Sequence, residues 1–166
     1  MYRAGSHRSA WHARIGEALA PLRQRNVLIV GSGSISHNLG EVFRPAPAGE
    51  RDWAENFTSW LADRAAAGDR DALLGTMQLA PDAARNYPTD EHLLPFFVAL
   101  GAGGDAPGRR IHHSYTYEVL AMDIYAFGEV DLLNRNGKAG SAAAPDEAIR
   151  SGVAHSALAA RLRPTR

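Results

Sequence analysis

The chain has 166 residues, 45% of them hydrophobic, so it can bury one sizeable core and a single domain is expected. Its 18 basic residues balance its 18 acidic residues, which leaves no net field to attract nucleic acid or an anionic membrane. The absence of cysteine excludes disulfides and thiolate metal sites. Because the N-terminus lacks the apolar core of a signal peptide and no apolar run is long enough to span a membrane, a cytoplasmic location is expected.

The N-terminal segment predicts a helix followed by a buried strand. Apolar residues, among them Trp11 and Ile15, recur at helical spacing through SAWHARIGEALAPLRQR. Ser9 is the expected N-cap, and Pro21 should kink the helix or end it at about the preceding residue. The next segment, NVLIV, is a short apolar run bounded by Gly31, which is typical of a strand buried on both faces in a parallel sheet. The order of helix and strand favours an α/β fold.

A Pro/Gly loop over residues 43–51 is followed by DWAENFTSWLADRAAAG, which predicts a helix capped by its first residue and ending at Gly68. Trp53, Phe57 and Trp60 lie on one face of this helix. An aromatic stripe at helical spacing is more often part of a core than a cage for an aromatic ligand, so we expect a docked helix.

Two more helices are predicted in the centre of the chain. The segment DRDALLGTMQLAP predicts a short helix that stops before Pro81. The apolar run in NYPTDEHLLPFFVALGAGG predicts a buried helix, with Thr89 or Asp90 as its cap and His92 in its first turn.

The C-terminal region predicts strands and then a tail. The segment RRIHHSYTYEVLAMDIYAFG alternates between two faces, which indicates one long strand or a hairpin. Residues 1–130 are therefore expected to form the folded domain. Residues 131–166 are rich in Gly, Ala and Ser and predict a flexible tail, although apolar residues around Leu158 have the spacing of a short terminal helix.

The segment GSGSISHNLG contains a glycine-rich turn that satisfies none of three known motifs. A dinucleotide fingerprint needs a third glycine where Ser36 stands, and a phosphate-binding P-loop needs a nearby lysine, whereas the single lysine of the chain is Lys138. A nucleophile elbow needs a serine where Gly33 stands. The turn therefore predicts neither nucleotide binding nor a serine nucleophile.

Two histidines lie where chemistry is expected. His37 follows the carboxyl end of the predicted strand, where ligands bind in open α/β sheets, and His92 lies near the start of a buried helix. Imidazole titrates near neutrality and binds metals, so each is a candidate acid/base or metal ligand, although a single histidine is more often a surface or core residue. His112 and His113 are adjacent, point to opposite faces of a strand, and cannot share a metal without distortion. No site is expected at the remaining histidines, which are His7, His12 and His155.

Four segments, in order, carry a resemblance to a known family: ALAPLRQRNVLIVGSGSISHNL, WAENFTSWL, PTDEHLLPFFVALGAG and SYTYEVLAMDIYAFG. Together they resemble the C-terminal half of the class III extradiol ring-cleavage dioxygenases, the LigB-like superfamily, and most of all its 4,5-DOPA dioxygenase-like branch. The resemblance runs from Trp11 to Gly128. It implies an α/β fold in which part of a mixed or parallel sheet is flanked by helices.

The resemblance implies an enzyme that opens catechol rings, such as that of DOPA, with O2 and a non-haem metal, Fe(II) in the first place and Zn(II) as the alternative. It implies that His37 is the catalytic acid/base and that His92 is a metal ligand, with His37 as a second candidate ligand. Asp90 and Glu91 are expected to orient the His92 ring.

The other two metal-binding histidines of the family belong to an N-terminal half that has no counterpart in this chain. We therefore expect an incomplete catalytic domain that is inactive unless another chain supplies them. An exposed apolar sheet face would favour homo-oligomers, or pairing with a chain that supplies the N-terminal half. The alternative is a non-catalytic remnant or a partner-binding subunit that retains the fold.

Overall fold

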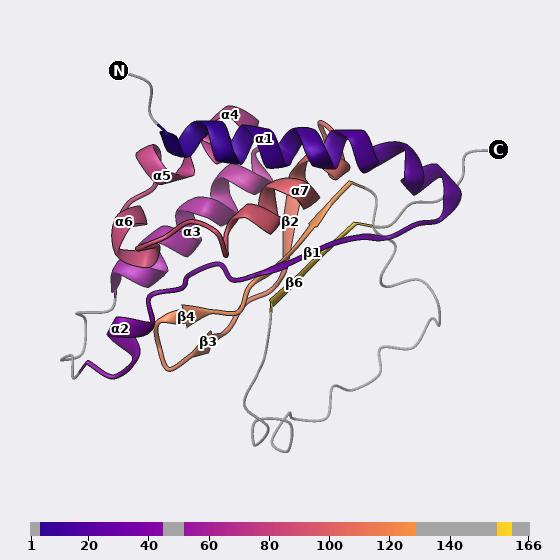
Figure 1. Cartoon of the computed structure of the whole chain (residues 1–166). Coiled ribbons are helices and arrows are strands. Elements are labelled where there is room, and N and C mark those ends of the chain that lie inside the picture. Colours follow the sequence, from indigo (N-terminus) through magenta and orange to yellow (C-terminus); the bar gives the residue numbers. More distant parts are fainter. Residues whose placement is uncertain (1–3, 45–51, 129–155, 161–166) are drawn as a thin grey trace, which may run out of the picture.

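A four-stranded mixed sheet forms the base of the fold (Figure 1), and the computed structural model describes residues 4–44, 52–128 and 156–160. The β1–β6 and β2–β5 pairs are antiparallel, and the β5–β6 pair is parallel. This arrangement confirms an α/β fold with a mixed sheet. The strands, in their order across the sheet, are β1 (Ile29–Gly33), β6 (Ser156–Ala160), β5 (Ile124–Phe127) and β2 (Gly108–His112).

The strand β1 differs from the predicted strand in position and in burial. It begins three residues later than NVLIV and runs into the glycine turn. Ile29 is buried, whereas Val30 is 49% exposed, so the prediction of a strand buried on both faces of a parallel sheet is wrong. The reason is topological: β1 is an outer strand of the described sheet, and its one strand partner there, β6, is antiparallel.

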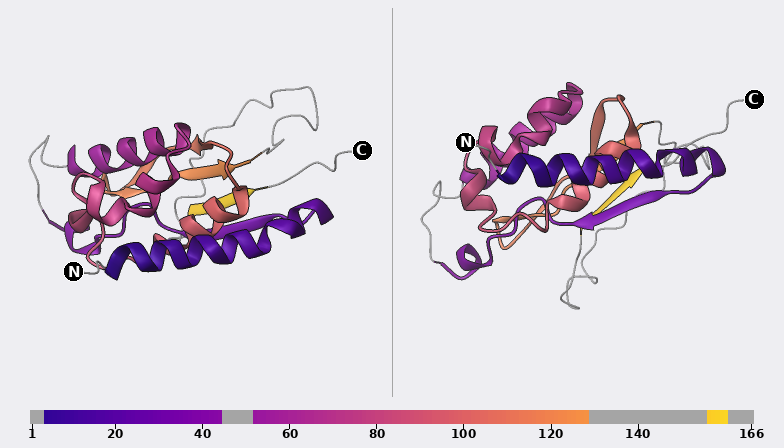
Figure 2. Two further views of the ribbon diagram at one scale, coloured as in Figure 1. Left: turned by 90° about the horizontal axis from the view of Figure 1, so that it is seen from above. Right: turned by 45° about the horizontal axis from the view of Figure 1, so that its top comes forward.

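Three helices form the layers above the sheet (Figures 1 and 2). The helix α7 (Leu94–Gly103) packs on β1, β5 and β6, and α3 (Asp52–Ala66) packs on β2. The helix α1 (Ala4–Leu19) lies along α7 as an outer layer. No helix in the described part of the chain is long and apolar enough to cross a membrane.

The helix α1 ends where proline predicts, but it buries a different face. It continues into the 3-10 helix η1 (Ala20–Arg25), which has Pro21 in its first turn. Ser9 is buried within α1, so it is not the N-cap. Trp11 and Ile15, predicted to lie on the apolar stripe, are exposed, because small residues such as Ala13 and Gly16 form the face that lies against α7.

The helix α3 forms in the predicted segment and belongs to the core, although Asp52 lies within it and it ends at Ala66, two residues before Gly68. Trp53 and Phe57 are buried and Trp60 packs against the core, which confirms the aromatic stripe as a packing surface. The helix is followed by Gly68 in a left-handed conformation, with φ of 66°. Residues 45–51 of the preceding predicted loop lie outside the described residues.

Several short helices connect these layers. The single helix expected before Pro81 is divided at Gly75, and Asp69 caps its first part by accepting a hydrogen bond from the Ala72 N–H at 3.1 Å. The helix α7 starts at Leu94 and not at the predicted cap, so His92 lies in the turn that precedes it. The short helices are α2 (Leu39–Val42), α4 (Arg70–Leu74), α5 (Thr76–Leu79) and α6 (Ala83–Asn86).

The predicted hairpin is confirmed, with a smaller hairpin inside it. The strands β2 and β5 pair with each other, and between them β3 (Tyr115–Thr116) pairs with β4 (Leu120–Ala121). Residues 156–160 form β6, so the alternative of a terminal helix around Leu158 is wrong. The rest of residues 131–166 lies outside the described residues, and the division into a domain and a flexible tail stays a prediction.

Aromatic rings fill the space between α7 and the sheet. Phe96 of α7 packs edge-on against Phe97, Tyr125 and Phe127, with ring centroids 5.3–5.5 Å apart. These four side chains are buried. Because each of them removes a large apolar surface from water, α7 is held firmly on β5.

Candidate active site

Glycines let the carboxyl end of β1 lie directly against the start of α7. A Cβ on Gly31 would lie 2.2 Å from the carbonyl oxygen of Pro95, and one on Gly33 would lie 2.2 Å from the carbonyl oxygen of His92. Neither position has room for a larger residue. The Ser34 N–H then donates to the same His92 carbonyl at 3.0 Å. The glycine turn, which fits no nucleotide motif, therefore serves to bring the chain after β1 next to His92.

The two histidines selected from the sequence meet at this point. The imidazole rings of His37 and His92 stack with their centroids 3.6 Å apart and an angle of 22° between their planes. His37 is partly buried, while the His92 side chain is 42% exposed. The pair is thus open to solvent on the His92 side and enclosed on the other.

Backbone groups around α6 hold the turn that carries His37. The His37 N–H donates to the Asn86 carbonyl at 3.0 Å, and the Asn38 amide donates to the Arg85 carbonyl at 2.6 Å. The Tyr87 hydroxyl donates to the Ser34 carbonyl. Sequence reasoning missed these contacts, because carbonyl acceptors leave no signal in residue type.

Burial is the main cause that lowers the pKa of His37, and the neighbouring His92 lowers it further. Glu91 and the hydrogen bond of the His37 backbone act in the opposite direction but do not reverse the shift. His37 is therefore mainly neutral at neutral pH. A neutral imidazole has a free lone pair, so His37 can accept a proton from a bound hydroxyl group.

The acidic residues beside His92 have different partners. Asp90 forms an ion pair with Arg8 of α1. The Glu91 carboxylate lies 3.8 Å from Nε2 of His92, which is longer than a hydrogen bond. A hydrogen bond from Thr89 is the main cause that lowers the pKa of Glu91, so this carboxyl group is charged beside the histidine pair.

The residues near the pair do not complete a metal site by themselves. Within residues 4–44, 52–128 and 156–160, no group of three or more His, Cys, Asp or Glu side chains is arranged to hold a metal ion. His92 has the ring donor and the exposure that a ligand needs. Further ligands would have to come from outside the described residues.

His112 and His113 lie apart from the stacked pair, and His113 belongs to a polar cluster around Asp123. Nδ1 of His113 is 2.7 Å from Oδ1 of the fully buried Asp123, and Arg110 lies 3.3 Å from the other oxygen of that carboxylate. His112 contacts Ser114 instead, with Nε2 2.8 Å from the hydroxyl oxygen. The strand β2 ends at His112, so His113 lies beyond it and the prediction of two neighbours on one strand is wrong, although the two histidines do contact different partners.

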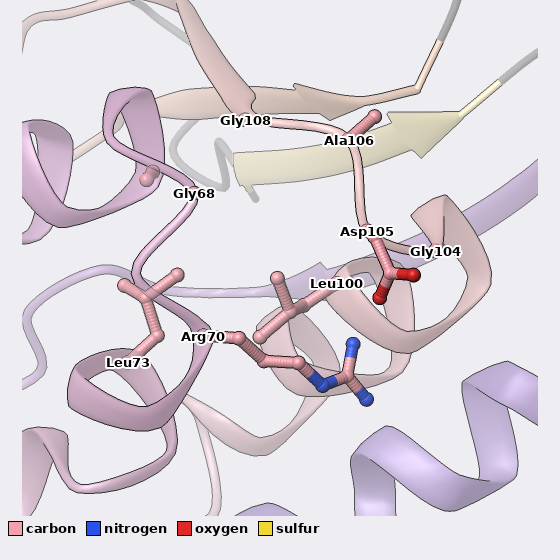
Figure 3. A pocket seen from close by; sticks show the side chains of 9 residues that line it. Gly68, Arg70, Leu73, Leu100, Gly104, Asp105, Ala106 and Gly108 are labelled. Carbon is pink, nitrogen blue, oxygen red and sulfur yellow. The ribbon is translucent and has the colours of Figure 1, made fainter.

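Cavities also occur in the described part of the chain apart from the stacked pair. The cavity in Figure 3 has a volume of about 60 Å³, and Arg70 and Asp105 are its charged lining residues. It is far smaller than ordinary ligand pockets of roughly 300–1,000 Å³. A groove of about 310 Å³ runs beside β1 and is lined by Val30, Leu94 and Pro95 among others, with Glu91 at its border to the pair. The sequence predicted neither cavity.

The model of the catalytic LigB subunit of aromatic ring-opening dioxygenases matches residues 3–128 of the chain. The chain belongs to this family. This match confirms the family resemblance noted from the four sequence segments. LigB proteins are non-haem metal-dependent dioxygenases.

Curated relatives of the LigB type include two plant proteins named 4,5-DOPA dioxygenase extradiol. The protein from Mirabilis jalapa is 38% identical over 102 residues, which cover 61% of this chain and 38% of the relative. The protein from Beta vulgaris is 34% identical over 117 residues, which cover 70% of this chain and 43% of the relative. The chain therefore spans less than half the length of these relatives.

A solved structure has the same LigB-like fold. It is the crystal structure of an uncharacterized protein from Escherichia coli K12, with a TM-score of 0.53 and 25% sequence identity. The match covers 69% of this chain and 48% of that one. The described fold thus corresponds to about half of a larger one.

Proposed function

We propose that this chain provides the His37 and His92 part of an extradiol dioxygenase site, which opens the ring of a catechol with O2. The observation that carries the proposal is the stack of the two imidazoles at 3.6 Å, formed by residues that are far apart in the sequence of a LigB family member. The names of the plant relatives suggest DOPA or a similar catechol as the substrate.

In this proposal His37 is the acid/base. Burial and His92 keep the His37 ring mainly neutral, so it takes a proton from a catechol hydroxyl as the substrate binds. The hydrogen bond from the His37 N–H to the Asn86 carbonyl fixes the backbone from which the ring projects. After ring opening, the protonated imidazole returns the proton to the product.

His92 is the proposed metal ligand of the chain, and His37 is the second candidate. Fe(II) is the proposed metal and Zn(II) the alternative, since imidazole suits both. When bound, such a metal supplies open positions that gather catechol and O2. Because the described residues do not complete its ligand set, we propose that another polypeptide supplies the missing donors.

The partner is proposed to correspond to the part of the relatives that this chain does not match. The chain covers 38% and 43% of the two plant proteins, so more than half of each has no counterpart here. Val30 and the groove beside β1 present apolar surface next to the histidine pair. A second copy of the chain is the alternative occupant of this surface.

Metal binding tests the ligand assignment. Isothermal titration of the metal-free chain with Fe(II), under anaerobic conditions, or with Zn(II) should show weak binding. Adding the unmatched part of the Beta vulgaris relative should produce one tight site. Replacing His92→Ala should abolish that site, whereas His112→Ala, on an exposed histidine of β2, should leave it unchanged. Equal affinity in the His92→Ala protein would contradict the assignment.

Turnover tests the activity itself. The chain is loaded with Fe(II) anaerobically, mixed with a catechol and air, and followed by the absorbance of the yellow ring-opened product, with and without the added polypeptide. We expect product when both parts are present. Sustained turnover by the chain alone, lost in His92→Ala, would show that its site is complete. A bound metal without product would favour the non-catalytic alternative.

A further inference from the structure

The small β3–β4 hairpin lies beside the segment that leads from β1 to α2 (Figure 1). At its tip, Tyr117 and Glu118 have φ angles of 54° and 62°. This left-handed region favours glycine, and neither residue is glycine. Such a conformation persists where surrounding contacts enforce it, and it is frequent near functional sites.

The contacts that enforce the hairpin come first from α3. Val119 is buried against Trp53. The Tyr115 hydroxyl donates to a Glu55 carboxylate oxygen at 2.7 Å and lies 2.7 Å from the Thr58 hydroxyl. The hairpin is therefore fixed to α3 from two sides, by an apolar contact and by a hydrogen-bonded tyrosine.

Ser36 ties this hairpin to the candidate site. Its side chain is fully buried, and its hydroxyl donates to the Val119 carbonyl at 2.7 Å and accepts from the Ala121 N–H at 2.8 Å. One hydroxyl thus uses both its donor and its acceptor capacity on the backbone on either side of Leu120. Ser36 directly precedes His37, so any displacement of this serine is passed to the histidine backbone.

We propose that Ser36 is a positioning residue for His37. It fastens the His37 turn to the β3–β4 hairpin and so keeps the His37 ring stacked on His92. The value of this position for proton transfer rests on the proposed dioxygenase function, but the positioning itself does not. An alanine at this site would leave the Val119 carbonyl and the Ala121 N–H unpaired in the interior, so the turn would shift to satisfy them.

The test is NMR spectroscopy of the metal-free 166-residue chain. Ring protons of His37 should carry a ring-current shift from the stacked His92, and His92→Ala removes it. In Ser36→Ala, the His37 ring resonances should move most of the way to their positions in His92→Ala. The matched control is Ser32→Ala, which changes an exposed serine of β1, four residues before Ser36, and should leave these resonances in place.

A second variant keeps the test decisive if Ser36→Ala does not fold. Tyr115→Phe removes the hydroxyl contacts of β3, the strand that pairs with β4, and should move the His37 resonances in the same direction by a smaller amount. Unchanged His37 resonances in a folded but less stable Ser36→Ala or Tyr115→Phe protein would overturn the proposal, because they would show a purely structural role.

Turnover separates this inference from the proposed function. With the complementing polypeptide present, Ser36→Ala should lower kcat by about tenfold or more with little change in KM, as for a misplaced acid/base. If no protein turns over but the NMR shifts follow the expected order, the dioxygenase proposal fails and the positioning role stands. Full kcat in Ser36→Ala would overturn the link to catalysis.

Discussion

His37 has surroundings unlike those of a histidine in water. Its ring is partly buried and lies 3.6 Å from a second imidazole, and both burial and this neighbour favour the neutral form. Two positive rings at this distance would repel each other. The stacked arrangement therefore favours the neutral form of His37.

The lowered pKa of His37 makes the stability of the chain depend on pH in a direction that can be measured. In the metal-free chain the unfolded state takes up a proton at this position near the ordinary pKa of about 6.5, before the folded state does. The contribution of His37 to stability is thus present above that pH and is lost as pH falls through the folded pKa. His37→Gln should flatten the decline of the free energy of unfolding between about pH 7 and pH 5.

An NMR titration gives the same answer directly. His37 should titrate below the ordinary range, and His92→Ala should raise its pKa because it removes one of the two causes. A His37 that titrates at or above about 6.5 in the folded wild-type chain would contradict the burial of its ring and its stacking on His92.

At the scale of elements, the site depends on how closely β1 lies on α7. The Gly31 and Pro95 backbones lie in close contact, and the hydrogen bond from the Ser34 N–H to the His92 carbonyl holds the two segments together. A strand with side chains at both glycine positions would stay further from the helix. The imidazole pair would then be separated.

Gly31→Ala tests this contact. The new Cβ would lie 2.2 Å from the Pro95 carbonyl, so we expect a loss of about 1–3 kcal/mol in the free energy of unfolding, measured in urea. The matched control is Gly40→Ala in α2, where the nearest atom, the Asn38 side-chain oxygen, is 3.3 Å away. An effect of Gly31→Ala no larger than that of Gly40→Ala would show that β1 and α7 move apart easily.

At the scale of the whole molecule, helices lie on one side of the sheet and apolar surface remains beside β1. Val27, Leu28 and Val30 are exposed along this strand and its approach. Such a surface next to a functional site is typical of an interface. It is consistent with a chain that matches about half of the solved relative.

Self-association is the expected behaviour of the isolated chain. Light scattering after gel filtration should show a mass that rises with protein concentration, and Val30→Lys should lower it while changing the stability of the folded chain by no more than about 0.5 kcal/mol. Phe43→Lys, which changes an exposed apolar residue beyond α2, should leave the mass unchanged. A constant monomer mass for the wild type would remove this support for an oligomer.

Local patterns were sufficient to find His37, His92, α3 and the β2–β5 hairpin. They were insufficient for Ser36 and Asn86, because these residues act through backbone partners more than 40 residues away. The exposed side of α1 was also predicted wrongly. The prediction from hydrophobic spacing was based on large apolar side chains, whereas the face of α1 that packs closely on α7 consists of small residues.

The sequence by itself determined the family and the α/β class, and it singled out the two candidate histidines, since these depend on motifs and on periodicity within short segments. Tertiary structure alone decided that the two imidazoles stack, that β1 is an outer strand, and that a buried serine binds the His37 turn to a hairpin. The physical reason is the range of the interactions. Helix and strand preferences act between neighbours, whereas stacking, strand order and backbone hydrogen bonds depend on which distant segments the packed core brings together.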